Sequence, residues 1–153
     1  GGALGRPVIL VSGTDLALDD ATRSLLLDLG VSRIIVAGGP NSVSEGIFAD
    51  LNEIAPTTRM SGADRFEASR AIAMEAFEGL SPSKVYIATG FNFPDALAGA
   101  AIAGRESAPL IVVQGNCVPG GTLDAISSLG ATSVTLLGGT ATLTANVQYL
   151  VRC

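Results

Sequence analysis

The sequence contains no histidine and no tryptophan, and Lys84 is its only lysine. Histidine is the usual general base and the commonest metal ligand, so its absence excludes Ser-His-Asp and Cys-His catalysis within this chain. Two cysteines without histidine also cannot assemble the usual structural zinc site. We therefore expect no catalytic centre of these kinds, no metal and no cofactor.

Charged side chains are scarce as well. They make up 15% of the 153 residues, with 9 basic against 14 acidic side chains and a net charge of −5. Lysine and arginine do not cluster, so we expect no nucleic-acid partner. An anionic ligand would have to be held by local donors and not by the overall field. No apolar run is long enough to span a membrane, although 48% hydrophobic residues suffice for a core.

The two cysteines, Cys117 and Cys153, are too far apart for a Cys-x-x-Cys redox motif. They are either two unrelated buried thiols or a disulfide that ties the end of the chain to a loop. A disulfide requires an oxidising compartment. The chain begins with glycine and not with methionine, which we interpret as a mature or excised piece of a longer protein.

Short apolar runs alternate with amphipathic stretches along the chain. The pattern predicts strands at 7–12, 33–37, 84–89, 109–113 and 133–137, and helices at 19–29, 44–54, 65–78, 95–103, 120–129 and 142–151. Residues 59–62 are predicted to be irregular. Strands that alternate with helices indicate an α/β fold with a parallel, Rossmann-like sheet that is covered on both faces.

The chain also resembles itself. Residues 7–13 match 109–115, and residues 29–44 match 129–144, whereas 59–104 has no earlier counterpart. We interpret the chain as one and a half copies of a βα repeat. Residues 1–57 would be the second half of a truncated repeat, and residues 58–153 would be a complete one.

Three motifs of this repeat resemble those of a known family. Residues 59–69, RMSGADRFEAS, resemble the RISGADRYETA opening of the cell wall-binding repeat 2 family. Residues 88–100 resemble its second signature, a strand end followed by GxNFPDALA. The Gly-Gly turns at 38–39 and 138–139 resemble its third, a strand followed by GGxxxVS. The three motifs occur in the order of the family.

The resemblance implies a non-catalytic module that anchors a secreted protein to the Gram-positive envelope. The implied partner is an anionic secondary cell-wall polymer or a peptidoglycan-associated glycan, bound non-covalently. Such repeats usually occur in threes, so other repeats of the same parent chain or a second copy are further expected partners. The segment 116–119, with a terminal cysteine, also resembles members with a paired cysteine. The resemblance to this family also implies a location outside the cell, in association with the wall.

Local arguments suggest roles for several motif residues. Asp64 is placed to cap a helix, and Arg65 in its first turn opposes the helix dipole, so it needs a carboxylate or a bound anion. The alternative is an ion pair of Arg65 with Asp95 or Asp64. Asn92 is expected to cap a helix whose first residue is Pro94. A metal held by the two aspartates is a weaker alternative.

The Gly-Gly turns bring strand ends to helix starts, where free N–H groups suit a phosphate or carboxylate. Alternatively, they are only tight turns that require positive φ angles. Phe91 and Phe93 either stack on a sugar ring or fill the space between packed repeats. The candidate ligand-binding residues are Arg59, Asp64, Arg65, Asn92, Asp95, Gly38, Gly39, Gly138, Gly139 and Thr140.

Two other functions remain open at this point. The missing half-repeat would leave an exposed apolar sheet edge, which favours a structural or self-association module that completes a multi-repeat assembly. A phosphate- or nucleotide-binding α/β enzyme is the second alternative. It is disfavoured because the chain lacks a base, a nucleophile constellation and a phosphate-binding loop of the GxGxxG kind.

Overall fold

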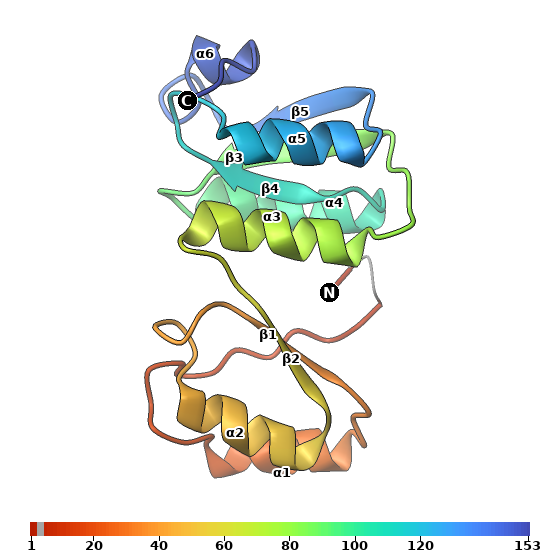
Figure 1. The fold of residues 1–153 in the computed structure, drawn as a ribbon, viewed down its shortest axis with the longest axis vertical. Coiled ribbons are helices and arrows are strands. Elements are labelled where there is room, and N and C mark those ends of the chain that lie inside the picture. The colour runs from red at the N-terminus through yellow and green to blue at the C-terminus, as the bar shows by residue number, and fades with distance from the viewer. Residues whose placement is uncertain (3–4) are drawn as a thin grey trace.

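The computed structural model describes residues 1–2 and 5–153. Two parallel sheets form separate units (Figure 1). The N-terminal unit, residues 5–60, holds α1 (Asp20–Asp28), β1 (Ile34–Ala37), α2 (Glu45–Ile54) and β2 (Thr57–Met60). The C-terminal unit, residues 61–153, holds α3 (Arg65–Ala76), β3 (Lys84–Thr89), α4 (Pro94–Arg105), β4 (Leu110–Val113), α5 (Gly120–Ser128), β5 (Ser133–Leu137) and α6 (Ala145–Gln148).

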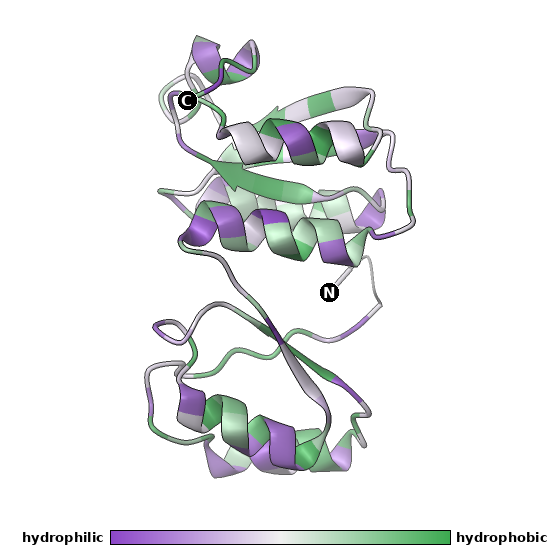
Figure 2. Ribbon diagram, viewed as in Figure 1, coloured by the Kyte–Doolittle hydropathy of each residue, from purple (hydrophilic) through white to green (hydrophobic). Residues whose placement is uncertain are grey.

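The sheet of the C-terminal unit has the strand order β4-β3-β5, with all strands parallel. Helices α3 and α5 cover one face and α4 covers the other (Figure 1). This confirms the predicted α/β fold. The central strand β3 is almost fully buried, and Figure 2 shows the neighbouring β4 as an apolar strand among helices of mixed polarity. Val85, Ile87, Ile111 and Val113 form the centre of the main core.

Among the described residues, the sheet of the N-terminal unit has two strands. β1 pairs in parallel with β2, in a register that places Ile34 beside Thr57 and Ala37 beside Met60. The helix α2 packs against both strands. The buried core here is small and consists of Leu18, Leu26, Val36, Ile47 and Leu51.

Two predictions for this unit were wrong. Residues 59 and 60 are not irregular as predicted but belong to β2, because β1 provides a parallel edge for them. Residues 7–12 are not a strand, although they correspond to β4 of the C-terminal unit. There β4 pairs with the central strand β3, and the sequence holds no earlier counterpart of β3. Without that neighbour, Val8 and Leu10 stay 74% and 90% exposed.

Capping side chains begin the helices of the N-terminal unit largely where the sequence indicates. Asp19 accepts a hydrogen bond from the Thr22 amide at the start of α1, and Ser44 accepts one from the Ile47 amide at the start of α2. Such bonds satisfy N–H groups that have no partner within the helix.

The last helix is much shorter than predicted. Instead of 142–151, α6 covers only Ala145–Gln148. The chain then turns at Leu150, which has a φ of 53°. Arg152 forms a parallel bridge to Val118, and Cys153 is bonded to Cys117. These contacts draw the end of the chain away from a helical path. Among the described residues, no helix is long and apolar enough to cross a membrane.

The two units share local hydrogen bonds at corresponding positions. The Gly13 carbonyl accepts from the Ser44 amide at 2.7 Å, and the Gly115 carbonyl accepts from the Thr144 amide at 2.8 Å. The self-similarity seen in the sequence therefore recurs as the same hydrogen bond between the glycine that ends an apolar run and the residue just before a helix.

Candidate functional site

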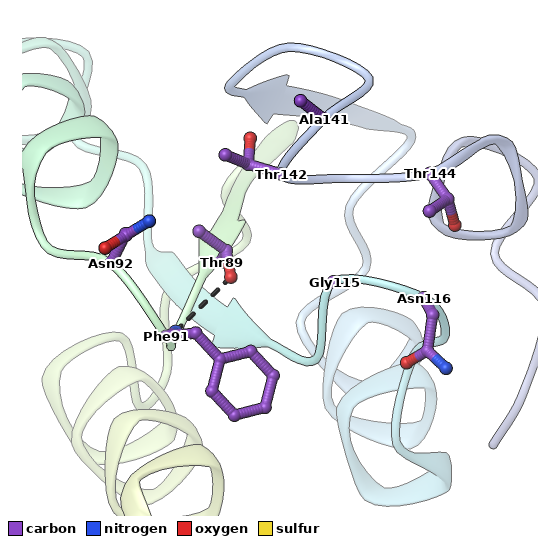
Figure 3. A pocket seen from close by; sticks show the side chains of 8 residues that line it. All are labelled: Thr89, Phe91, Asn92, Gly115, Asn116, Ala141, Thr142 and Thr144. Atoms are coloured by element: carbon purple, nitrogen blue, oxygen red, sulfur yellow. Dashed lines mark hydrogen bonds between the residues drawn. The ribbon is translucent and has the colours of Figure 1, made fainter.

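A cavity of about 340 Å³ lies at the carboxyl ends of the three strands of the C-terminal unit (Figure 3). Its volume falls within the range of small-ligand sites. It is lined by Thr89, Phe91, Asn92, Gly115, Asn116, Ala141, Thr142 and Thr144. Open parallel sheets bind ligands at this edge, because the loops that follow the strands converge there.

The order of the strands explains why these residues meet. Thr89 is the last residue of the central β3, Gly115 follows β4, and Thr142 lies in the turn after β5. Because the strands are parallel, the loops that follow them end at one edge of the sheet. The cavity therefore combines three segments that are distant in the sequence.

The lining of the cavity combines polar and apolar groups and carries no formal charge. It presents threonine hydroxyls, asparagine amides and one aromatic ring. Thr89 Oγ1 accepts a hydrogen bond from the Phe91 amide at 3.3 Å. The Phe91 ring is 67% exposed and stands edge-on to Phe66, with 5.7 Å between the centroids. Neutral donors and acceptors beside an exposed aromatic face are a suitable surface for a sugar ring.

The disulfide Cys117–Cys153 lies beside this cavity. Its Cα atoms are 5.1 Å apart, and it confirms the pairing that the sequence left open. Cys117 directly follows Asn116 of the lining. The Val118 amide also donates to the Val151 carbonyl at 2.9 Å. The end of the chain therefore holds one wall of the cavity in place.

Asp64 and Arg65 begin α3. The Asp64 carboxylate accepts from the amides of Phe66 at 2.9 Å and Glu67 at 2.8 Å, which confirms its predicted role as a cap. The expected ion pair of Arg65 with Asp64 or Asp95 is not among the ion pairs of the described residues. Instead, Arg65 Nη1 donates to the Gly90 carbonyl at 2.8 Å. A backbone carbonyl thus takes the place of the carboxylate or bound anion that was expected beside Arg65.

Asn92 lies in the cavity lining and does not cap α4. The cap residue is Phe93, which forms no side-chain cap bond, and Pro94 is the first helical residue as predicted. Asp95 in the first turn lies against Gly138: a Cβ atom at Gly138 would be 2.8 Å from Asp95 Oδ2. The structure thus brings Asn92, Asp95 and Gly138 to the same edge of the sheet.

Gly139 and Thr140 are exposed in the turn after β5 and do not line the cavity. Gly38, Gly39 and Arg59 lie in the other unit and take part in local structure. Arg59 Nη1 donates to the carbonyl of Gly38, and the Gly39 carbonyl accepts from two amides of its own turn. Both Gly-Gly turns end several residues before the following helix, so their N–H groups are not those of a helix start.

A cluster of hydrogen-bonded titratable side chains lies away from the cavity. Tyr86 and Lys84 donate to Glu106 Oε2 at 2.6 Å and 3.0 Å. These hydrogen bonds, that of Tyr86 first, hold the pKa of Glu106 below its ordinary value. The bond to Glu106 raises the pKa values of Lys84 and Tyr86. Lys84 begins β3, whereas the cavity lies beyond the end of that strand.

Sequence reasoning missed most of the cavity lining. It identified Asn92 and considered Phe91, but not Thr89, Asn116, Thr142 and Thr144. Thr89 ends a predicted strand and Asn116 follows one by three positions, whereas Thr142 and Thr144 fall inside the helix that was predicted at 142–151. The general rule that α/β sheets bind ligands beyond the carboxyl ends of their strands was the signal that points to them.

Comparisons with known proteins agree with this architecture. Cwp6 from Clostridium difficile is 29% identical with a TM-score of 0.80, and the match covers 89% of this chain and 22% of that one. Cwp8 from Clostridium difficile, at 24% identity and a TM-score of 0.72, shares the fold over 86% of this chain and 22% of its own.

Among curated proteins, N-acetylmuramoyl-L-alanine amidase LytC of Bacillus subtilis (strain 168) is 31% identical over 143 residues. That match covers 94% of this chain but only 27% of the amidase, so the chain spans about a quarter of this relative. The family described as Cell wall binding domain 2 matches residues 59–148, which include one copy of each of the three motifs and all residues that line the cavity. The chain therefore belongs to the cell wall binding domain 2 family and is a cell-wall-binding module.

Proposed function

We propose that this module has no catalytic role and anchors a secreted protein to the Gram-positive envelope by non-covalent binding of an anionic wall polymer. The observation that carries the proposal is the cavity at the carboxyl ends of β3, β4 and β5. Its neutral hydroxyl and amide groups suit the hydroxyls of a sugar, and the exposed Phe91 ring suits its apolar face.

The anionic groups of the polymer need a cation near the cavity, because the net charge of −5 repels them. Arg65 is exposed and lies close by. Its guanidinium donates to the carbonyl of Gly90, and both neighbours of Gly90, Thr89 and Phe91, line the cavity. The remaining N–H groups of Arg65 are suited to a phosphate or carboxylate of the polymer.

Secretion and the domain division are parts of the same proposal. The disulfide Cys117–Cys153 supports an oxidising environment. The repeated hydrogen bonds of the two units support a division into residues 1–57 and 58–153. Strand pairing crosses that division, since β2 (Thr57–Met60) completes the sheet of the preceding half-repeat.

Binding to isolated Gram-positive walls tests the ligand. The chain should sediment with the walls, less so at high salt, and should lose binding when non-peptidoglycan polymers are extracted. Phe91→Ala should weaken binding, whereas Phe93→Ala is the matched control, because Phe93 is 75% exposed but lies outside the cavity.

Two arginine variants test the role of positive charge. Arg65→Gln should reduce both the binding to walls and the dependence of this binding on salt. Arg105 is an exposed arginine at the end of α4, and Arg105→Gln should change neither. Equal losses for both phenylalanine variants would reject the cavity as the site. Unchanged binding after polymer extraction would reject the anionic polymer.

A structural or self-association role is the second candidate. The observation that favours it is the exposure of Val8 and Leu10, beside which no strand lies in the described part of the chain. Concentration-dependent association in light scattering, abolished by Leu10→Asp, would support it. A stable monomer at all concentrations would reject it.

A further inference from the structure

In the described part of the chain, no strand lies beside the outer edge of β5. In the strand order β4-β3-β5, β5 pairs with β3 and lies outermost in the sheet (Figure 1). None of its five side chains is buried, in contrast to the central β3. An edge strand presents unpaired N–H and C=O groups, which are a template for another strand.

The N-terminal unit contains the same strand with its edge occupied. β1 corresponds to β5 in the internal repeat, and β2 pairs along its outer edge. The amide of Ile34 donates to the Pro56 carbonyl at 3.0 Å, and the amide of Gly38 donates to the Met60 carbonyl at 2.8 Å. These bonds attach the β2 segment at both ends of β1.

Arg59 of β2 adds a second attachment. Its Nη1 donates to the carbonyls of Gly38 at 2.9 Å and Val43 at 2.8 Å. The side chain is only 13% exposed. Its guanidinium also lies over the Phe48 ring, 4.7 Å from the centroid. The β2 segment is thus held against β1 by backbone hydrogen bonds and by the Arg59 side chain, which donates to two carbonyl groups.

The corresponding carbonyls in the C-terminal unit belong to Gly138 and Leu143. The Gly138 turn has the same shape as that of Gly38, with φ angles of 131° and 125°. Yet neither the amide nor the carbonyl of Gly138 has a hydrogen-bond partner in the described part of the chain, nor has the carbonyl of Leu143. Gly138 is exposed, whereas Gly38 is partly buried by β2.

The end of this chain does not fill the edge. After α6, Arg152 pairs with Val118 and Cys153 is bonded to Cys117, on the side of β4 and α5. The β2 segment of a second copy is already engaged with its own β1. An occupant of the β5 edge would therefore be a β2-type segment that is not paired elsewhere.

We propose that the outer edge of β5 is a docking site for a β2-type segment of another repeat unit. The segment adds a fourth parallel strand beside Val134–Gly138, and its arginine, in the position of Arg59, donates to the carbonyls of Gly138 and Leu143. Main-chain bonds provide affinity and the arginine provides register. In the C-terminal unit, Ala145 and Gln148 stand in place of Glu45 and Phe48, which contact Arg59 in the N-terminal unit. The docked arginine would therefore be bound mainly by the two carbonyl groups.

The test uses the full chain and a synthetic peptide with the sequence of residues 55–64, blocked at both ends. Amide exchange is followed residue by residue by NMR. The amides of Val134 and Gly138 correspond to those of Ile34 and Gly38, so the peptide should slow their exchange. The Ser133 amide already donates to the Ser83 carbonyl, and its exchange should stay unchanged.

Two controls isolate the mechanism. A peptide with Arg59→Gln should protect much less at equal concentration, and a scrambled peptide should not protect at all. Equal protection by the native and Arg59→Gln peptides, or none at Gly138 with saturating native peptide, would overturn the proposal. A dimer with exchanged β2 segments, detected by light scattering, would also overturn it, because the occupant would then be a second copy.

Discussion

Arg59 Nη1 donates to the carbonyl oxygen of Gly38 at 2.9 Å and so links β2 to the turn that follows β1. The same nitrogen donates to the Val43 carbonyl just before α2. One side chain thereby joins a strand, a glycine turn and a helix start. In the sequence it belongs to the motif that opens the complete repeat, yet it stabilises the half-repeat that precedes it.

The first prediction concerns this link. Arg59→Gln should destabilise the chain by about 2 kcal/mol, because the two carbonyls lose a charged donor in a largely buried position. Chemical denaturation should show a lower midpoint. Arg33→Gln is the control, since that side chain is 58% exposed with only a distant ion pair to Glu75, and it should have little effect. Equal effects of the two variants would contradict this role of Arg59.

Gly138 and Gly139 are adjacent but should respond differently to alanine. Gly138 has a φ of 131°, and a Cβ there would lie 2.5 Å from Thr142 Oγ1. Gly138→Ala should therefore cost about 1–3 kcal/mol. At Gly139 the Cβ would meet no atom within 4 Å, and the φ is not positive, so Gly139→Ala should be nearly neutral. Thermal unfolding of the two variants measures the difference, and a neutral Gly138→Ala would contradict the turn geometry.

The disulfide closes a loop between residues that are 36 positions apart. In the chain-entropy picture a loop of this size stabilises the folded state by about 4 kcal/mol. The double variant Cys117→Ser with Cys153→Ser should unfold at a lower denaturant concentration. It should also bind walls more weakly, because Cys117 adjoins the Asn116 wall of the cavity. A reducing agent should lower the denaturation midpoint of the native chain in the same way. An unchanged midpoint would contradict a stabilising role of the disulfide.

Glu106 makes stability depend on pH. Its pKa is lowered in the folded state by the hydrogen bonds from Tyr86 and Lys84. A carboxylate with a lowered folded-state pKa stabilises fully above its unfolded pKa, and this contribution disappears as the pH falls through the folded-state pKa. The melting temperature should therefore fall less steeply on acidification in Glu106→Gln than in the native chain. Glu78→Gln, an exposed residue after α3, serves as the control and should retain the native slope.

Local sequence signals determined most of the regular elements. The strands at 84–89 and 133–137 have the predicted bounds, because each is a short apolar run that ends directly before a glycine. Asp19, Ser44 and Asp64 determined three helix starts, since each side chain caps N–H groups within its own turn. The three motifs, in the order of the family, were sufficient to identify the family from the sequence.

Only the tertiary structure decided the features that need a distant partner. Residues 7–12 look like a strand but lack the neighbour that would pair with them, and residues 57–60 become a strand because β1 provides one. The disulfide and the Val118 bridge shorten α6. The cavity exists because the strand order brings Thr89, Asn116 and Thr142 together. Hydrogen-bond pairing and strand order depend on which segments meet in space, and local sequence does not determine that.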